Sequence, residues 1–262
     1  MSGLSAALWC EALKARGSKV LWISFLFFAF VAVILALLMV VARHPSLAGD
    51  SVIVGQKAAR LGDGDWSSLL AFLVQTILAL GPLGFGIVTS WTFGREDVDH
   101  TLKDLLSLPT RRTTIVTAKF LVVAIWSAAL ALVLFFLALA VGWALGTPGW
   151  SPSVLRHALI EFAVGSFLTI LLCSPVAFVA SASKGYLLPI GLVLLVLILT
   201  QLLGMGMPAA MPYFPWAIPA VCSGAAAAAL PPANIVSYLM LGLTCLIGFF
   251  ATVWWWRYAD HA

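Results

Sequence analysis

The chain has 262 residues, of which 63% are hydrophobic and 9% are charged, with a formal net charge of +4. A soluble globular domain carries roughly 25% charged residues, so this composition excludes a water-exposed surface around one buried core. We expect the excess apolar surface to face lipid, and residues 1–262 to form a single all-α integral membrane domain without a separate soluble catalytic module.

The first 19 residues form a short, mixed segment that precedes the first long apolar run. Its apolar residues recur at spacings compatible with one helical face, and its basic residues are Lys14, Arg16 and Lys19. A partly amphipathic, basic helix ahead of a membrane span tends to lie in the membrane interface. We therefore predict an N-terminal interfacial helix.

Six apolar stretches follow, each near the length of about 20 residues that a spanning helix needs. They cover residues 20–41, 66–93, 115–145, 155–182, 186–203 and 235–256. Residues 204–232 contain six prolines and no charged residue. Proline resists the helix interior, so we expect short broken extracytoplasmic helices here that dip into the membrane interface.

The distribution of lysine and arginine predicts the orientation of the chain. With both termini in the cytoplasm, ten of these residues lie inside and four outside, the latter being Arg43, Lys57, Arg60 and Arg156. Cytoplasmic loops carry an excess of Lys and Arg. A multi-pass protein with both termini cytoplasmic is therefore predicted.

A charged island at residues 93–119 separates the second and third apolar stretches. It holds five of the fourteen Lys and Arg residues and four of the ten Asp and Glu residues. Leu102, Leu105 and Leu106 share one face at helical spacing, and Pro109 ends the pattern. A short amphipathic helix held at the cytoplasmic ends of two spans is suited to dock into a groove of a soluble partner.

The order of residues in this island resembles that of a known family. The matching positions are Glu96, Asp99, Thr101, Leu102, Leu105, Leu106, Pro109, Arg112 and Lys119. This run is similar to the region between the second and third spans of type-2 ATP-binding-cassette (ABC-2) permeases, above all the small six-span permeases associated with peptide-antibiotic resistance and lantibiotic immunity. The chain departs from that pattern at His100, where the family usually has glycine.

The resemblance implies a role for each matched position. The three leucines would form the apolar face of a coupling helix that docks into a nucleotide-binding subunit. Glu96 and Asp99 would cap or orient that helix, while Arg112 and Lys119 would anchor the return to the membrane surface. The simpler alternative, that these charges only mark a cytoplasmic loop, remains open.

The resemblance also implies partners and a location. It implies an exporter in a bacterial plasma or inner membrane, with two ABC ATPase subunits that bind ATP and magnesium, and a second permease copy or homologue. Membrane lipid is an expected partner and nucleic acid is not. The chain has no phosphate-binding loop signature G-x-x-x-x-G-K-[ST], and no H-E-x-x-H or G-x-S-x-G. We therefore expect no catalytic, cofactor-binding or metal-binding residues in it.

Two further groups of residues are candidates for a substrate pathway or gate. Glu161 is a carboxylate within a predicted span, which by default suggests a functional role, although Arg156 or His157 at helical spacing offers structural pairing instead. The second group lies in the proline-rich segment and comprises Met207, Met211, Tyr213 and Trp216. These side chains suit an adaptable surface for a lipid-like or amphipathic substrate, and ordinary interfacial packing is an equal alternative.

Two other function classes are compatible with a multi-pass membrane chain. An integral-membrane enzyme acting on lipid-linked substrates needs several polar residues at one depth, whereas the predicted spans offer one carboxylate and scattered hydroxyls. An ion-coupled secondary transporter predicts internal repeats, and no convincing repeat is present. The sequence does not determine the substrate, the direction of transport, or whether two permease chains are identical.

Overall fold

A computed structural model describes residues 3–44, 64–101, 110–183, 185–223 and 231–258. All of the regular secondary structure in these ranges is helical. The helices are α1 (Gly3–Arg16), α2 (Lys19–Arg43), α4 (Trp66–Val98), α6 (Arg112–Ala144), α7 (Pro152–Leu171), α8 (Ser174–Ala182), α9 (Leu187–Gly206), η2 (Pro208–Tyr213), α10 (Ile218–Cys222) and α11 (Ile235–Tyr258).

Six helical segments among the described residues are long and apolar enough to cross a membrane, which confirms the predicted number of spans. They are Lys19–Arg43, Trp66–Val98, Arg112–Ala144, Pro152–Ala182, Leu187–Gly206 and Ile235–Tyr258. Because each helix extends somewhat beyond its apolar run, several charged residues that flank the predicted spans belong to helices in the structure.

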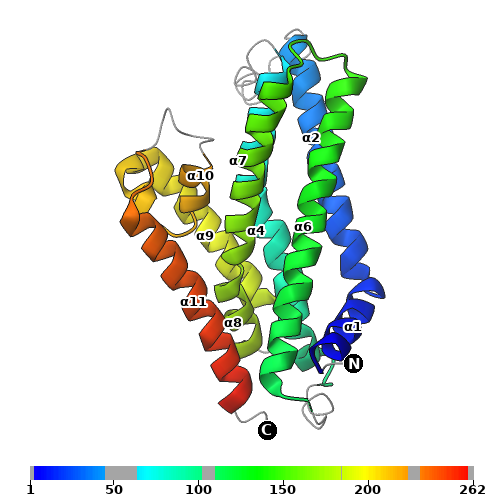
Figure 1. The fold of residues 1–262 in the computed structure, drawn as a ribbon, viewed down its shortest axis with the longest axis vertical. Helices are drawn as coiled ribbons and strands as arrows, with labels where there is room; N and C mark the ends of the chain where they lie inside the picture. The colour runs from blue at the N-terminus through cyan, green and yellow to red at the C-terminus, as the bar shows by residue number, and fades with distance from the viewer. Residues whose placement is uncertain (1–2, 45–63, 102–109, 184, 224–230, 259–262) are drawn as a thin grey trace.

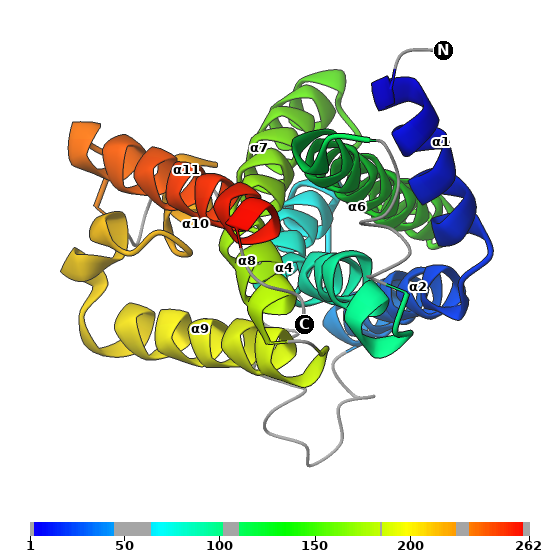
Figure 2. The ribbon, with the colours of Figure 1, turned by 90° about the horizontal axis from the view of Figure 1, so that it is seen from below.

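Helix α4 is the central element of the bundle. It contacts α2, α6, α7, α8 and α9, and Figure 2 shows it surrounded by these helices. Its buried side chains, such as Leu69, Leu73 and Ile77, extend the apolar core along much of its length. Close packing of this kind, rather than a difference in hydrophobicity from lipid, holds spanning helices together.

The fourth span is divided into α7 and α8, with Pro175 in the first turn of α8. Helix α8 packs against α11 and α4, whereas α7 packs against α4 and α6. Figure 1 shows α9 and α11 on the side of α8, whereas α7 belongs to the longer bundle with α2, α4 and α6. The predicted continuous fourth span is therefore correct in extent but broken in the middle.

The end of the bundle opposite to α1 is closed by aromatic rings and one arginine. Trp66 packs edge-to-face on Trp143 and Trp150, with ring centroids 5.6 and 4.7 Å away. Arg43 donates hydrogen bonds to the carbonyl oxygens of Gly64 and Leu145, the latter at 2.6 Å. Because Arg43 satisfies carbonyls at the ends of two connections, it joins the end of α2 to the turn after α6.

Between the fifth and sixth spans the chain forms the short helices η2 and α10. Both begin at or next to a proline, where the missing amide proton costs no helical hydrogen bond. Broken helices were predicted here from the six prolines. Their position in the membrane interface stays a prediction.

Candidate functional site

Helix α1 turns Glu11 and Lys14 inward, whereas several of its large apolar residues and Arg16 are exposed. Glu11 is 4% exposed, whereas Trp9 and Leu13 are 63% and 51% exposed. The inward face packs against α6, and α1 lies at the same end of the molecule as the last turn of α11 (Figure 1). An apolar outer face with a buried charge is the reverse of a water-soluble helix and suits a helix that faces lipid.

Four charged side chains from α1, α4 and α6 form a closed ring, which we call the charge ring (Glu11, Lys14, Glu96 and Lys119). The Lys119 ammonium lies 2.7 Å from Glu96 Oε1 and 3.1 Å from Glu11 Oε2. The Lys14 ammonium lies 2.7 Å from Glu11 Oε1 and 3.2 Å from Glu96 Oε1. Each ammonium therefore contacts both carboxylates, and the ring is neutral as a whole.

Lys119 is the innermost member of the charge ring and is fully buried. Its third hydrogen bond goes to the carbonyl oxygen of Thr92, at 2.8 Å. Its ammonium also lies over the ring of Trp256, 5.6 Å from the centroid, and the Trp256 indole donates to Ser181 Oγ at 2.9 Å. One lysine thus connects α1, α4 and α6 to α11 and, through Trp256, to α8.

The members of the charge ring on α1 keep their charges over a wide pH range. Burial alone would raise the pKa of Glu11, but the Lys119 and Lys14 ammonium groups outweigh it and hold that pKa below its ordinary value. Burial would lower the pKa of Lys14, but Glu11 and Glu96 raise it above its ordinary value. The stabilisation from Glu11 is therefore present at neutral pH and is lost only as the pH falls through its lowered pKa, while that from Lys14 is lost only at strongly alkaline pH.

Helix α4 ends beside the charge ring in a Schellman motif. The amide of Thr101 donates to the carbonyl of Glu96, and the amide of His100 donates to that of Asp97, at 3.0 and 3.3 Å. His100 has a φ of 55°, in the left-handed region that favours glycine. His100 therefore stands in a backbone conformation that suits glycine, the residue that the family pattern usually has at this position.

Two of the predicted coupling residues occupy places other than those expected. Lys119 was expected at the membrane surface, but α6 begins at Arg112, so Lys119 lies two turns inside the helix and is buried. Glu96 was expected to cap or orient the following helix, but it lies within α4 and its carboxylate joins the charge ring at 1% exposure. Both residues therefore have interior ion pairs in place of the predicted surface roles.

The remaining predicted coupling residues surround the charge ring or lie outside the described part of the chain. Asp99 is the C-cap of α4 and lies 3.7 Å from Arg95. Arg112 donates to the carbonyl oxygens of Trp256 and Arg257, at 3.1 and 3.2 Å, and so binds the C-terminal end of α11. Outside the described residues are Leu102, Leu105, Leu106 and Pro109.

Two adjoining hollows lie along α4: one of about 490 Å³ between α2 and α4, and one of about 210 Å³ between α4 and α9. They share Gln75, Ala79 and Gln201. Met211 and Trp216 line the smaller hollow, whereas Glu161, Met207 and Tyr213 line neither of the two. Two of the five predicted pathway residues, Met211 and Trp216, therefore line a hollow together with Gln75 and Gln201. These two glutamines were not predicted as pathway residues.

Glu161 and Tyr213 each contact a polar neighbour. His157 Nε2 lies 3.2 Å from Glu161 Oε1, at the helical spacing that suggested pairing. Asn234 donates a hydrogen bond to the hydroxyl of Tyr213 at 3.4 Å. Met207 is 62% exposed, and whether any of these residues contacts a substrate stays a prediction.

The half of the charge ring on α1 was not predicted as a site. Lys14 was interpreted only as a basic residue of the N-terminal segment, and Glu11 was given no role. The signal in the sequence was the isolation of Glu11, the only acidic residue among the first 49 positions. A carboxylate three residues before a lysine on a helix predicts that the two side chains are neighbours, but not that they face inward.

The chain matches one family model and is similar to a bacterial transport protein. The family model described as "ABC-2 family transporter protein" matches residues 7–200. That match begins within α1, extends over the charge ring and the charged island, and ends within α9. The chain is also similar to the "Bacitracin transport permease protein BCRB" of Bacillus licheniformis, with 29% identity over 185 residues, which cover 70% of this chain and 87% of that protein.

Proposed function

Because the chain belongs to the ABC-2 family of transporter proteins, we propose that it is the permease of an ATP-driven exporter of amphipathic molecules. It is a membrane permease subunit and not an enzyme, and membership of the family implies ABC ATPase subunits as partners. In the proposal, two ATPase subunits bind ATP and magnesium, and a second permease copy or homologue completes the pathway.

We propose that the charge ring transmits the movement of the ATPase to the permease. It joins the end of α4 to the beginning of α6, and residues 102–109 connect these two helix ends. A force applied to that connection acts on α4 and α6 together, because Glu96 and Lys119 hold them in one unit that also includes α1. We infer that the ends of α4 and α6 face the cytoplasm, as the distribution of lysine and arginine predicts.

The coupling proposal is tested by replacing Leu105 with aspartate in the chain co-expressed with its ATPase. Removing a buried leucine from an apolar contact costs about 1.5–3 kcal/mol, so binding of the ATPase is expected to weaken at least about tenfold. Co-purification in mild detergent and the rate of ATP hydrolysis measure the effect. Ser107→Asp is the matched control, because the same charge then lies on the predicted opposite face of the helix.

Retention of the ATPase by Leu105→Asp, at the level of Ser107→Asp, would exclude residues 102–109 as the docking segment. Failure of the unmodified chain to retain an ATPase would contradict the wider proposal. Both variants must insert into the membrane in equal amounts for the comparison to hold.

The two hollows along α4 support a proposed substrate pathway. Gln75 and Gln201 are exposed on the surfaces of spanning helices. Gln75 lies nine residues inside α4, about 14 Å from the helix end. We infer that it lies near the middle of a bilayer core of about 30 Å, with the beginning of α4 at the edge of that core. An exposed amide at that depth is costly in hydrocarbon, which favours a position facing a second permease chain or a hydrated pathway.

The lining of this pathway supports an amphipathic substrate. Apolar side chains with a few amide groups suit an amphipathic molecule, and the name of the Bacillus relative indicates bacitracin transport in that protein. Bacitracin is therefore the first probe for this chain.

Gln201→Leu is expected to lower bacitracin export about two- to tenfold, the effect of losing one hydrogen bond of 0.5–1.5 kcal/mol. Uptake of labelled bacitracin by inverted vesicles that contain the chain and its ATPase measures the change. Thr244→Val, a polar-to-apolar change on α11 at a hydroxyl that bonds its own helix, is the control. Equal transport by both variants would argue against the pathway.

A further inference from the structure

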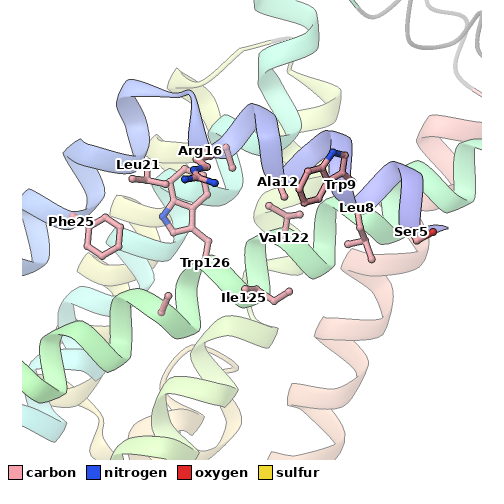
Figure 3. Close-up of a pocket in the computed structure, with 12 residues that line it drawn as sticks. Ser5, Leu8, Trp9, Ala12, Arg16, Leu21, Phe25, Val122, Ile125 and Trp126 are labelled. Carbon is pink, nitrogen blue, oxygen red and sulfur yellow. The ribbon is translucent and has the colours of Figure 1, made fainter. Parts of the chain in front are cut away.

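A third hollow, of about 620 Å³, lies between α1, α2 and α6 and is separate from the proposed pathway. Figure 3 shows side chains of α1 and α6 facing one another across it, with Trp9 and Phe25 toward opposite ends. Apart from Ser5 and Arg16, its lining is apolar. The indole nitrogen of Trp126 does not add polarity, because it donates to Ser24 Oγ at 3.2 Å.

The hollow lies next to the charge ring and opens onto an exposed apolar surface. Ala15 and Val122 line it, and they lie one helical turn beyond Glu11 and Lys119. The surrounding surface is apolar, since Trp22 is 69% exposed and Ile125, which lines the hollow, is 67% exposed. An apolar cavity does not hold water, so hydrocarbon from the bilayer is the natural occupant.

The rim of the hollow carries positive charge. Arg16 lines the hollow and is exposed in the last turn of α1. Lys19 does not line it, but is exposed at the first residue of α2, two positions before the lining residue Leu21. Neither forms an ion pair with any residue that the structure describes, whereas Lys14 and Lys119 are fully engaged in the charge ring. Basic residues beside a pocket among spanning helices favour anionic lipid headgroups.

We propose that this hollow binds one anionic phospholipid, with an acyl chain between α1, α2 and α6 and its phosphate on Arg16. The bound lipid fills the space beneath α1 that no side chain occupies. Since α1 is fixed to α4 and α6 by the charge ring, the lipid becomes part of the packing at that end of the bundle. This inference requires only that the chain spans a membrane and is independent of the proposed substrate and pathway.

The test is native mass spectrometry of the purified chain titrated with phosphatidylglycerol and with phosphatidylcholine that carries the same acyl chains. One tight phosphatidylglycerol adduct is expected, with a preference over phosphatidylcholine of at least about fivefold, the contribution of one basic residue near an anionic surface. Arg16→Gln is expected to abolish this preference, while Arg111→Gln, an exposed arginine away from the hollow, retains it.

Filling the hollow tests the acyl-chain part of the proposal. Ala129→Trp and Ala12→Trp place an indole inside it and are expected to remove the tight adduct, whereas Ala128→Trp, at an exposed neighbouring position that does not line it, retains the adduct. Equal binding of the two lipids by the unmodified chain would overturn the anionic assignment. An adduct that persists in the Ala12 and Ala129 variants would overturn the site itself.

Discussion

Replacing Lys119 with methionine is expected to lower the free energy of unfolding by about 3–5 kcal/mol, because it leaves a buried carboxylate without its partner. The unmodified ring balances two carboxylates with two ammonium groups. Without Lys119, only Lys14 remains to balance Glu11 and Glu96, both of which are nearly inaccessible to solvent. Unfolding in mixed micelles by titration with sodium dodecyl sulfate, followed by circular dichroism, measures the loss.

A double-mutant cycle separates the ion pair from the volume change. Glu96→Gln together with Lys119→Met restores neutrality, so the double variant is expected to be more stable than Lys119→Met alone. Lys14→Met is expected to cost less, since the Lys14 side chain is 23% exposed and part of its hydration is retained. A loss below about 1 kcal/mol for Lys119→Met, a value ordinary for any substitution, would show that the charge ring does not hold these helices together.

The charge ring need not add net stability over an apolar core of the same shape. In a buried ion pair, the attraction between the charges often only offsets the free energy that they lose when they are removed from water. We infer that these ion pairs make the arrangement specific, because α1 has an apolar outer face and, among the described residues, no other ion pair that would fix it on α6. The ion pair of Lys119 with Glu11 therefore fixes the position of α1 on α6. An apolar contact alone would define that position less sharply.

The spans were predictable because hydropathy and length follow directly from the sequence. Six runs of apolar residues become six spans, and the structure differs mainly in where the spans end and in the division of the fourth into α7 and α8. Helix α6 begins at Arg112, three residues before the predicted span, because the polar residues 112–114 are also helical. Lys119, which was expected at the membrane surface, therefore lies inside the helix and is buried.

The charge ring was not predictable from periodicity. Lys119 and Glu11 are 108 positions apart, and only the packing of α1 on α6 brings them within 3.1 Å. Glu96 was recognised through the family pattern, but a pattern in the sequence does not indicate which neighbour a side chain contacts. The glutamines that line the hollows beside α4 were overlooked for a related reason: Gln75 and Gln201 lie on different helices, and each alone resembles an ordinary packing residue.

Gly248→Ala is expected to destabilise the protein by about 1–3 kcal/mol, because a single added methyl group overlaps the backbone of a neighbouring helix. A Cβ atom at Gly248 would lie 2.5 Å from the amide nitrogen of Pro175 and 2.6 Å from the carbonyl carbon of Ser174. At the same crossing, Ser174 Oγ donates to the carbonyl of Cys245 at 3.0 Å, so separating α8 from α11 also breaks a hydrogen bond. Small residues at such crossings allow spanning helices to approach closely.

The matched control lies on the same helix. A Cβ atom at Gly242 would meet no heavy atom within 4 Å. Gly242→Ala is therefore expected to be neutral or to stabilise α11 by up to about 1 kcal/mol, through the higher helix propensity of alanine. Melting temperatures of the two variants in one detergent are thus expected to move in opposite directions or, at the least, to differ clearly. Equal shifts would mean that this crossing does not hold α8 against α11, and that the contacts of Lys119 and Arg112 with the end of α11 hold it in the bundle instead.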